Sequence, residues 1–147
     1  LGGNVVVMGT SPSNEVGWNV GVQDPDEVRG EIVGTQRVIN AAIVTSGIYE
    51  RYLEVDGTKY HHIMDPRTGY PLDNEISGVT VFAPTSFDGD SYSTALFLMG
   101  IEEGIEFINS KDGFEVAYVD KEGGVHLSAG IKDSFNLTNE EYYIADE

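Results

Sequence analysis

Residues 79–100 read VTVFAPTSFDGDSYSTALFLMG, and the character of the chain changes inside this stretch. Its start, Val79–Phe82, is a β-branched and aromatic run that is typical of a strand. Residues 86–99 instead carry apolar side chains at helical spacing. The chain before this point has the pattern of strands, and helices are expected to follow it, so the sequence indicates an α+β fold in which a mostly antiparallel sheet packs against a few helices.

The helix expected over residues 86–99 has recognisable ends. Ser86 is expected to be its N-cap, with Asp88 and Asp90 in the first turns. Gly100 is a natural C-terminal stop. The core-facing stripe of this helix is expected to consist of Tyr92, Ala95, Leu96 and Met99.

Most of the chain before residue 79 is expected to form strands. Alternating or β-branched runs between turn residues predict strands over residues 4–8, 18–23, 35–39, 42–45, 49–55 and 58–60. The runs 35–39 and 42–45 are expected to form a pair that is broken near Asn40. Asp56-Gly57 is expected to be a hairpin turn, because this dipeptide suits type I′ geometry. Trp18 is expected in the core.

The chain after the helix shows three further features. A short helix is expected over residues 102–108, followed by a hairpin of residues 114–119 and 125–127. The acidic end, residues 139–143, is expected to fray. No repeat, linker or long apolar run interrupts the 147 residues, so we interpret them as one domain without a membrane span.

Composition excludes several classes of function. Eight basic and 25 acidic residues give a net charge of −17. Such a charge disfavours binding to nucleic-acid phosphates or to an anionic membrane, and it suits the binding of cations. The chain has no cysteine, which excludes disulfides, thiolate metal sites and a cysteine nucleophile.

The first candidate site is the polar loop HHIMDPRTGYP at residues 61–71. It holds two imidazoles, a carboxylate, a guanidinium and a hydroxyl in a stretch stiffened by prolines, and such loops position groups for binding or catalysis. A decorated turn is the structural alternative. In that case Asp65 accepts backbone hydrogen bonds and Arg67 forms a surface ion pair.

The second candidate site lies on the expected helix. Asp90 and Thr94 are four residues apart, so they share one helix face. A carboxylate and a hydroxyl one turn apart suit Mg²⁺, which takes one or two protein ligands and fills its shell with water and substrate phosphate. The structural alternative is capping by Asp88 or Asp90, with Thr94 bonded to its own backbone.

Two smaller features complete the candidates. Thr45-Ser46-Gly47 ends an expected strand and could offer hydroxyls to a ligand, although a simple turn explains the same residues. His126 lies alone among strand-like residues and is expected to be structural.

The loop and the helix together resemble a known family. Residues 60–69, YHHIMDPRTG, resemble the signature loop of the ApbE family, the FAD:protein FMN transferases. Residues 90–100 resemble that family's metal-binding helix. Shorter stretches match in order and approximate spacing at residues 1–4, 45–47 and 49–52. The resemblance runs from Leu1 to about Gly130 and implies the C-terminal part of an ApbE domain, which is T-fold-like.

The resemblance implies a reaction in which FAD is split at its pyrophosphate. FMN is joined to a threonine hydroxyl of an acceptor flavoprotein, and AMP is released. Asp90 and Thr94 would hold Mg²⁺ against the pyrophosphate oxygens. His62 would be the general base or a flavin contact. The expected FAD-binding residues are Thr45, Ser46, Gly47, His62, Asp65, Arg67 and Thr68. Among these, Asp65 and Thr68 would shape the loop or touch the ligand, and Arg67 could pair with a phosphate.

The chain is shorter than the family it resembles. The N-terminal half of the family, which is expected to supply flavin contacts and a backbone ligand for the metal, is not present in it. We therefore interpret residues 1–147, which begin without Met or a signal peptide, as the C-terminal portion of a longer flavin transferase.

The sequence is compatible with other functions as well. The chain could be a flavin- or acceptor-binding module without catalysis, or an FAD pyrophosphatase that yields FMN and AMP. The expected partner is an acceptor flavoprotein subunit that carries the target threonine. A homodimer would cover apolar surface exposed by the missing half. By resemblance, the protein is expected to be exported, either to the periplasm or as an anchored lipoprotein.

Overall fold

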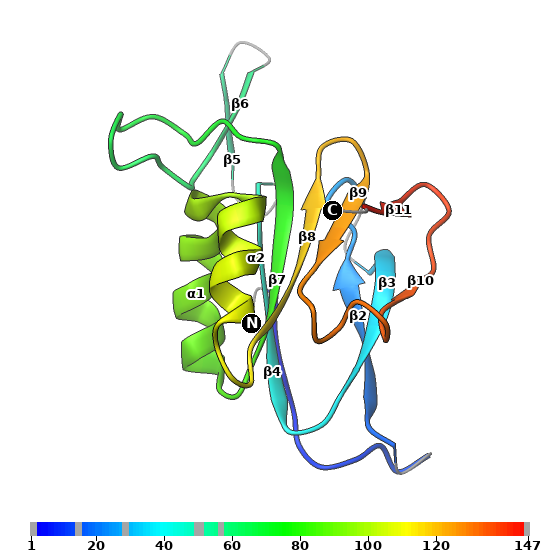
Figure 1. The fold of residues 1–147 in the computed structure, drawn as a ribbon. Helices are drawn as coiled ribbons and strands as arrows, with labels where there is room; N and C mark the ends of the chain where they lie inside the picture. Colours follow the sequence, from blue (N-terminus) through cyan, green and yellow to red (C-terminus); the bar gives the residue numbers. More distant parts are fainter. Residues whose placement is uncertain (1–2, 14–15, 28–29, 49–51, 56–57, 146–147) are drawn as a thin grey trace.

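A six-stranded sheet forms the centre of the fold (Figure 1). The computed structural model describes residues 3–13, 16–27, 30–48, 52–55 and 58–145. In spatial order the strands are β1 (Asn4–Val7), β4 (Ala41–Gly47), β7 (Ile76–Ala83), β8 (Glu115–Asp120), β9 (Gly124–Leu127) and β11 (Tyr143–Ile144). All neighbours are antiparallel except β11, which runs parallel to β9. The predicted α+β fold is confirmed.

Two helices cover one face of this sheet (Figure 1). Helix α1 (Ser86–Met99) packs on β4 and β7, and α2 (Ile101–Asn109) packs on β8. Every residue of β7 is buried, because the strand has a neighbour on each side and a layer over each face. No helix in the described ranges is long and apolar enough to cross a membrane.

The opposite face of the sheet packs against a smaller one. Strands β2 (Trp18–Gln23), β3 (Ile32–Val38) and β10 (Asn136–Leu137) form a three-stranded sheet in the order β10-β3-β2. A hydrophobic core fills the space between the two sheets, and its members include Val22, Val33, Ile43, Phe82 and Val125. Strands β5 (Tyr52–Val55) and β6 (Thr58–His61) form a separate antiparallel hairpin. The predicted turn at 56–57 and residues 49–51 of the expected strand lie outside the described residues.

The expected pairing of residues 35–39 with 42–45 is wrong. Strand β3 pairs with β2 and β10, whereas β4 pairs with β1 and β7. Asn40 has a φ of 48°, a left-handed conformation in which the chain turns between the two strands. The connection therefore leads from one sheet into the other instead of closing a hairpin.

Helix α1 has the predicted bounds but a different cap and a different buried face. Thr85, extended at φ −131° and ψ 154°, is the N-cap, since its side chain accepts a hydrogen bond from Asp88 N at 3.2 Å. Ser86 is the first helical residue, and its hydroxyl accepts a hydrogen bond from Asn4 of β1. The buried residues of the helix are Gly89, Ser93, Leu96 and Phe97. Of the expected stripe, Leu96 is buried, while Tyr92, Ala95 and Met99 are half-buried, because Gly89, Ser93 and Phe97 occupy the rest of the buried face.

Two further expectations need correction. Trp18 is half-exposed rather than in the core, and its indole Nε1 donates to Met8 O at 3.2 Å. The C-terminal segment does not fray, because β11 pairs with β9 and Tyr142 is buried. The second helix and the β8–β9 hairpin are confirmed as predicted, within a residue or so at each end.

Candidate functional site

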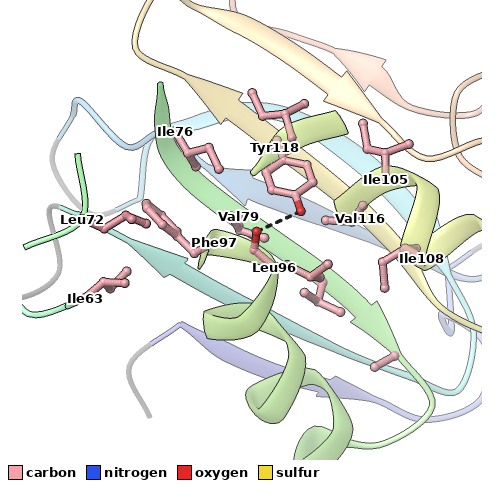
Figure 2. Packing of buried hydrophobic residues seen from close by; sticks show 13 residues of the cluster. Ile63, Leu72, Ile76, Val79, Leu96, Phe97, Ile105, Ile108, Val116 and Tyr118 are labelled. Carbon is pink, nitrogen blue, oxygen red and sulfur yellow. Dashed lines mark hydrogen bonds between the residues drawn. The ribbon is translucent and has the colours of Figure 1, made fainter. Parts of the chain in front are cut away.

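The loop between β6 and β7 is anchored at its base to the C-terminal end of α1. Ile63 and Leu72 are buried and lie beside Phe97 of α1 (Figure 2). Leu72 N donates to Ile63 O at 2.9 Å, and Asn74 Nδ2 donates to Phe97 O at 3.0 Å. The buried side chains of Ile63 and Leu72 thus hold the polar segment between them, residues 64–71, beside the C-terminal end of α1.

Asp65 organises that polar segment. Its carboxylate accepts hydrogen bonds from Arg67 N, Nε and Nη2 at 2.8, 3.0 and 2.9 Å. Its carbonyl accepts from Thr68 N and Gly69 N, and its own N–H donates to Tyr70 O. These hydrogen bonds from Arg67 hold the pKa of Asp65 below its usual range. Gly69, at φ 72°, takes the left-handed position that closes the turn.

This geometry matches the decorated turn predicted as the structural alternative for the loop. The Asp65 side chain is 11% exposed and forms its hydrogen bonds within the turn. The Arg67 side chain, which forms the ion pair with it, is 81% exposed. Thr68 is exposed, and its Oγ1 accepts a hydrogen bond from Tyr70 N at 3.3 Å. His62, at the entrance of the loop, is exposed as well. The loop therefore presents His62, Arg67 and Thr68 at its surface, with Asp65 as its internal support.

Thr45 and Ser46 lie near the end of β4 and point to opposite faces of the sheet, as successive strand residues do. The Thr45 hydroxyl lies 2.9 Å from the Thr80 hydroxyl of β7. Ser46 Oγ donates to Ser93 Oγ of α1 at 2.9 Å. Gly47 is buried at the last position of the strand. Each hydroxyl is thus engaged inside the protein, and the structure does not bring the two together.

Asp90 and Thr94 lie on one exposed flank of α1, one helical turn apart. Their oxygens are the hard donors that Mg²⁺ prefers, and their exposure leaves room for water and phosphate in its shell. Within the described part of the chain, no group of three or more His, Asp or Glu residues could hold a metal ion. The pair fits a magnesium site that takes two protein ligands and completes its shell from elsewhere.

Helix α1 connects the candidate elements. The loop is attached at its C-terminal end, Asp90 and Thr94 lie in its middle turns, and Ser46 contacts it through Ser93. Of the shorter stretches that carry the resemblance, residues 1–2 and 49–51 lie outside the described part of the chain. Sequence reasoning gave no role to Ser93, although it directly precedes Thr94.

His126 has a structural partner, as expected. Its Nε2 lies 2.8 Å from Asp120 Oδ2, and the same carboxylate accepts from Glu122 N and Gly124 N in the β8–β9 turn. Burial raises the pKa of Asp120, but these hydrogen bonds outweigh burial and lower that pKa overall. The pair holds the hairpin and lies on strands away from α1.

Comparison with known proteins shows the family of the chain. The ApbE family model matches residues 1–118, so the chain belongs to the ApbE family. The match contains the polar loop, the Thr45-Ser46-Gly47 segment and the whole of α1.

Individual relatives agree with this assignment. An FAD:protein FMN transferase of Klebsiella pneumoniae (strain 342) is 37% identical over 146 residues, which are 99% of this chain and 44% of that protein. One of Treponema pallidum (strain Nichols) is 33% identical over 98% of this chain and 42% of its own length. The crystal structure of the ApbE protein from Thermotoga maritima is similar at a TM-score of 0.75 and 34% identity, over 90% of this chain and 42% of that one. The chain thus spans less than half the length of these relatives.

Proposed function

We propose that this chain takes part in the transfer of FMN from FAD to a threonine hydroxyl of an acceptor flavoprotein, with Mg²⁺ bound and AMP released. The observation that carries the proposal is the pair Asp90 and Thr94, exposed on one flank of α1 in a member of the ApbE family. The names of the relatives support FAD, FMN and a protein acceptor. The metal, the threonine and the released AMP are parts of the proposal itself.

Asp90 and Thr94 would hold Mg²⁺, which neutralises charge on the pyrophosphate oxygens when it is bound. His62 would take the proton of the acceptor hydroxyl, since a neutral imidazole is suited to this task near neutral pH. The threonine oxygen then forms its bond to the FMN phosphorus, and the bond from that phosphorus to the oxygen of the AMP phosphate breaks. Asp65 would keep the loop in shape through its hydrogen bonds with Arg67, and the part of the Arg67 guanidinium that does not bond Asp65 would pair with a phosphate.

The proposal is tested by the intact mass of an acceptor protein incubated with the chain, FAD and Mg²⁺, together with the AMP released. We expect a mass gain of one FMN moiety and an equal amount of AMP. Asp90→Ala should abolish both, because the carboxylate ligand is lost. Glu103→Ala, which removes an exposed carboxylate from the first turn of α2, is the matched control and should change neither.

Two results would contradict the proposal. Transfer by Asp90→Ala at the rate of the unsubstituted chain would mean that Asp90 holds no metal needed for the reaction. AMP release that is independent of the acceptor, without a gain in mass, would identify an FAD pyrophosphatase instead. Export of the protein stays a prediction that rests on the family resemblance. The formation of a homodimer stays a prediction that rests on the apolar surface a missing half would expose.

A further inference from the structure

The turn of α1 that carries Asp90 and Thr94 is joined to β4 at two points. Gly89 and Ser93 are buried, lie four residues apart, and directly precede Asp90 and Thr94. Because residues four apart share a helix face, one pair meets the sheet while the other occupies the neighbouring exposed flank. The position of the two candidate metal ligands is therefore determined by the two contacts beneath them.

The first contact is a close approach of the helix backbone at Gly89 to the side chain of Val44 on β4. A Cβ at position 89 would lie 2.6 Å from Val44 Cγ2 of β4, nearer than real carbon atoms come. Only glycine lets α1 lie this close to the strand. The helix is therefore seated on β4 at the turn that begins with Asp90.

The second contact is a chain of hydrogen bonds. Ser46 Oγ on β4 donates to Ser93 Oγ at 2.9 Å, and Ser93 Oγ donates to Asp90 O at 3.2 Å. Ser93 is 1% exposed, so water does not compete for its hydroxyl. The chain connects the end of β4 to the backbone of Asp90 itself and fixes the rotation of this turn about the helix axis.

We propose that Ser93 is a positioning residue for the metal pair, supported by Ser46. The inference rests on the proposed function, since it takes Asp90 and Thr94 as the ligands of Mg²⁺. Neither serine touches the metal in this account. Without the Ser93 hydroxyl, α1 still packs through Gly89, Leu96 and Phe97, but the turn with the two ligands can rotate and shift on β4. The expected consequence is a weaker metal site on a chain that is still folded.

The test uses Mn²⁺ as a paramagnetic substitute for Mg²⁺, titrated into the full 147-residue chain and followed by electron paramagnetic resonance. We expect Ser93→Ala to weaken Mn²⁺ binding about three- to tenfold, the worth of one net hydrogen bond. Ser134→Ala is the matched control, since it removes a bond of 3.0 Å from Gln36 in the other sheet. It should leave Mn²⁺ binding unchanged.

Two more variants separate the outcomes. Ser46→Ala breaks the same chain from the side of β4, so it should weaken Mn²⁺ binding in a similar way even if Ser93→Ala does not fold. The double variant should bind about as weakly as either single one, because the hydroxyls act as one chain. Additive losses would overturn the proposed coupling.

Asp90→Ala distinguishes the inference from the function on which it rests. If Asp90→Ala loses Mn²⁺ binding while Ser93→Ala and Ser46→Ala, both folded by circular dichroism, bind like the unsubstituted chain, the positioning role is overturned and the metal site stands. If Asp90→Ala keeps its affinity, or the unsubstituted chain binds no Mn²⁺, the metal assignment fails and the positioning role falls with it.

Discussion

At the scale of single residues, three aspartates have three different surroundings. Asp65 is enclosed by its own turn and by Arg67, Asp120 is partly buried beside His126, and Asp90 is exposed on the flank of a helix. Only Asp90 keeps its carboxylate on an open surface next to a second oxygen donor, Thr94. This difference, rather than residue type, makes Asp90 the candidate ligand.

Asp120 should make the stability of the chain depend on pH. Its folded-state pKa lies below the ordinary value of 3.8, so the unfolded chain binds a proton more readily. Its contribution to stability is therefore complete above about pH 4 and is lost as the pH falls through the folded-state pKa. Urea unfolding of Asp120→Asn and of the unsubstituted chain, between about pH 7 and pH 3, should show a difference in free energy that shrinks below about pH 4.

Asp73 provides the control for this measurement. Its side chain is 98% exposed and lies 3.4 Å from Lys121 at the surface, so Asp73→Asn should show no comparable dependence on pH. A difference for Asp120→Asn that stays constant across the range would mean that the hydrogen bonds to Asp120 do not favour its charged form.

At the scale of elements, small residues decide how closely the two helices approach the sheet. Gly89 lets α1 lie against Val44 of β4, and Gly104 lets α2 lie against Tyr118 of β8. The Tyr118 hydroxyl donates to Leu96 O at 3.3 Å (Figure 2). Burial raises the pKa of this hydroxyl. One buried tyrosine thus joins α1, α2 and the central sheet.

Gly104→Ala should destabilise the protein. An added Cβ would overlap the Tyr118 hydroxyl, and overpacking of this kind costs about 1–3 kcal/mol. Most of that range exceeds the roughly 1 kcal/mol that Ala normally gains over Gly in a helix. Denaturant unfolding measures the change. Tyr118→Phe removes the hydroxyl that the added methyl would overlap, so Gly104→Ala should lower stability less in that background. An equal loss of stability in both backgrounds would argue against this packing.

At the scale of the whole molecule, the C-terminal segment ties the two sheets together. Strand β10 adds to the small sheet, and β11 adds to the large one. Between them, the hydroxyl of Tyr142 donates to the fully buried carboxylate of Asp24 at 2.6 Å, and Asn139 Nδ2 donates to the same group at 3.1 Å. The segment therefore joins the end of β2 to the far edge of the central sheet.

Tyr142→Phe should lower the free energy of unfolding by about 1–3 kcal/mol, because it leaves a buried carboxylate without one of its donors. Hydrogen exchange should become faster in β2 and β3 as well as in β11. Tyr143→Phe is the control, since that neighbour is 51% exposed and should change little. Equal stability of the two variants would contradict the role given to the segment.

Sequence reasoning succeeds where the signal is local. Gly100 ends α1 as predicted, and the β8–β9 hairpin and α2 follow from their own residues. Prediction from the sequence fails where strand pairing or a hydrogen bond joins residues that are far apart in the chain. Nothing in the sequence near β3 indicates that β10, a hundred residues later, pairs with it. Nothing near Asp24 indicates that its carboxylate accepts a hydrogen bond from Tyr142.

The candidate site follows the same division. The spacing of Asp90 and Thr94 was enough to predict a shared face. The opposite directions of Thr45 and Ser46 also follow from strand alternation. The hydrogen bond that joins Ser46 to Ser93 could not be predicted, because it depends on which helix covers β4.

The central claim is that Asp90 holds a Mg²⁺ ion that FAD binding requires. It is tested most directly by the thermal stability of the unsubstituted chain and of Asp90→Ala, each titrated with FAD with and without Mg²⁺. A ligand that binds the folded state raises stability by mass action. We predict a rise with FAD that requires Mg²⁺ in the unsubstituted chain and is absent in Asp90→Ala. An identical rise in Asp90→Ala, or no rise from an unsubstituted chain shown to be folded, would contradict the account.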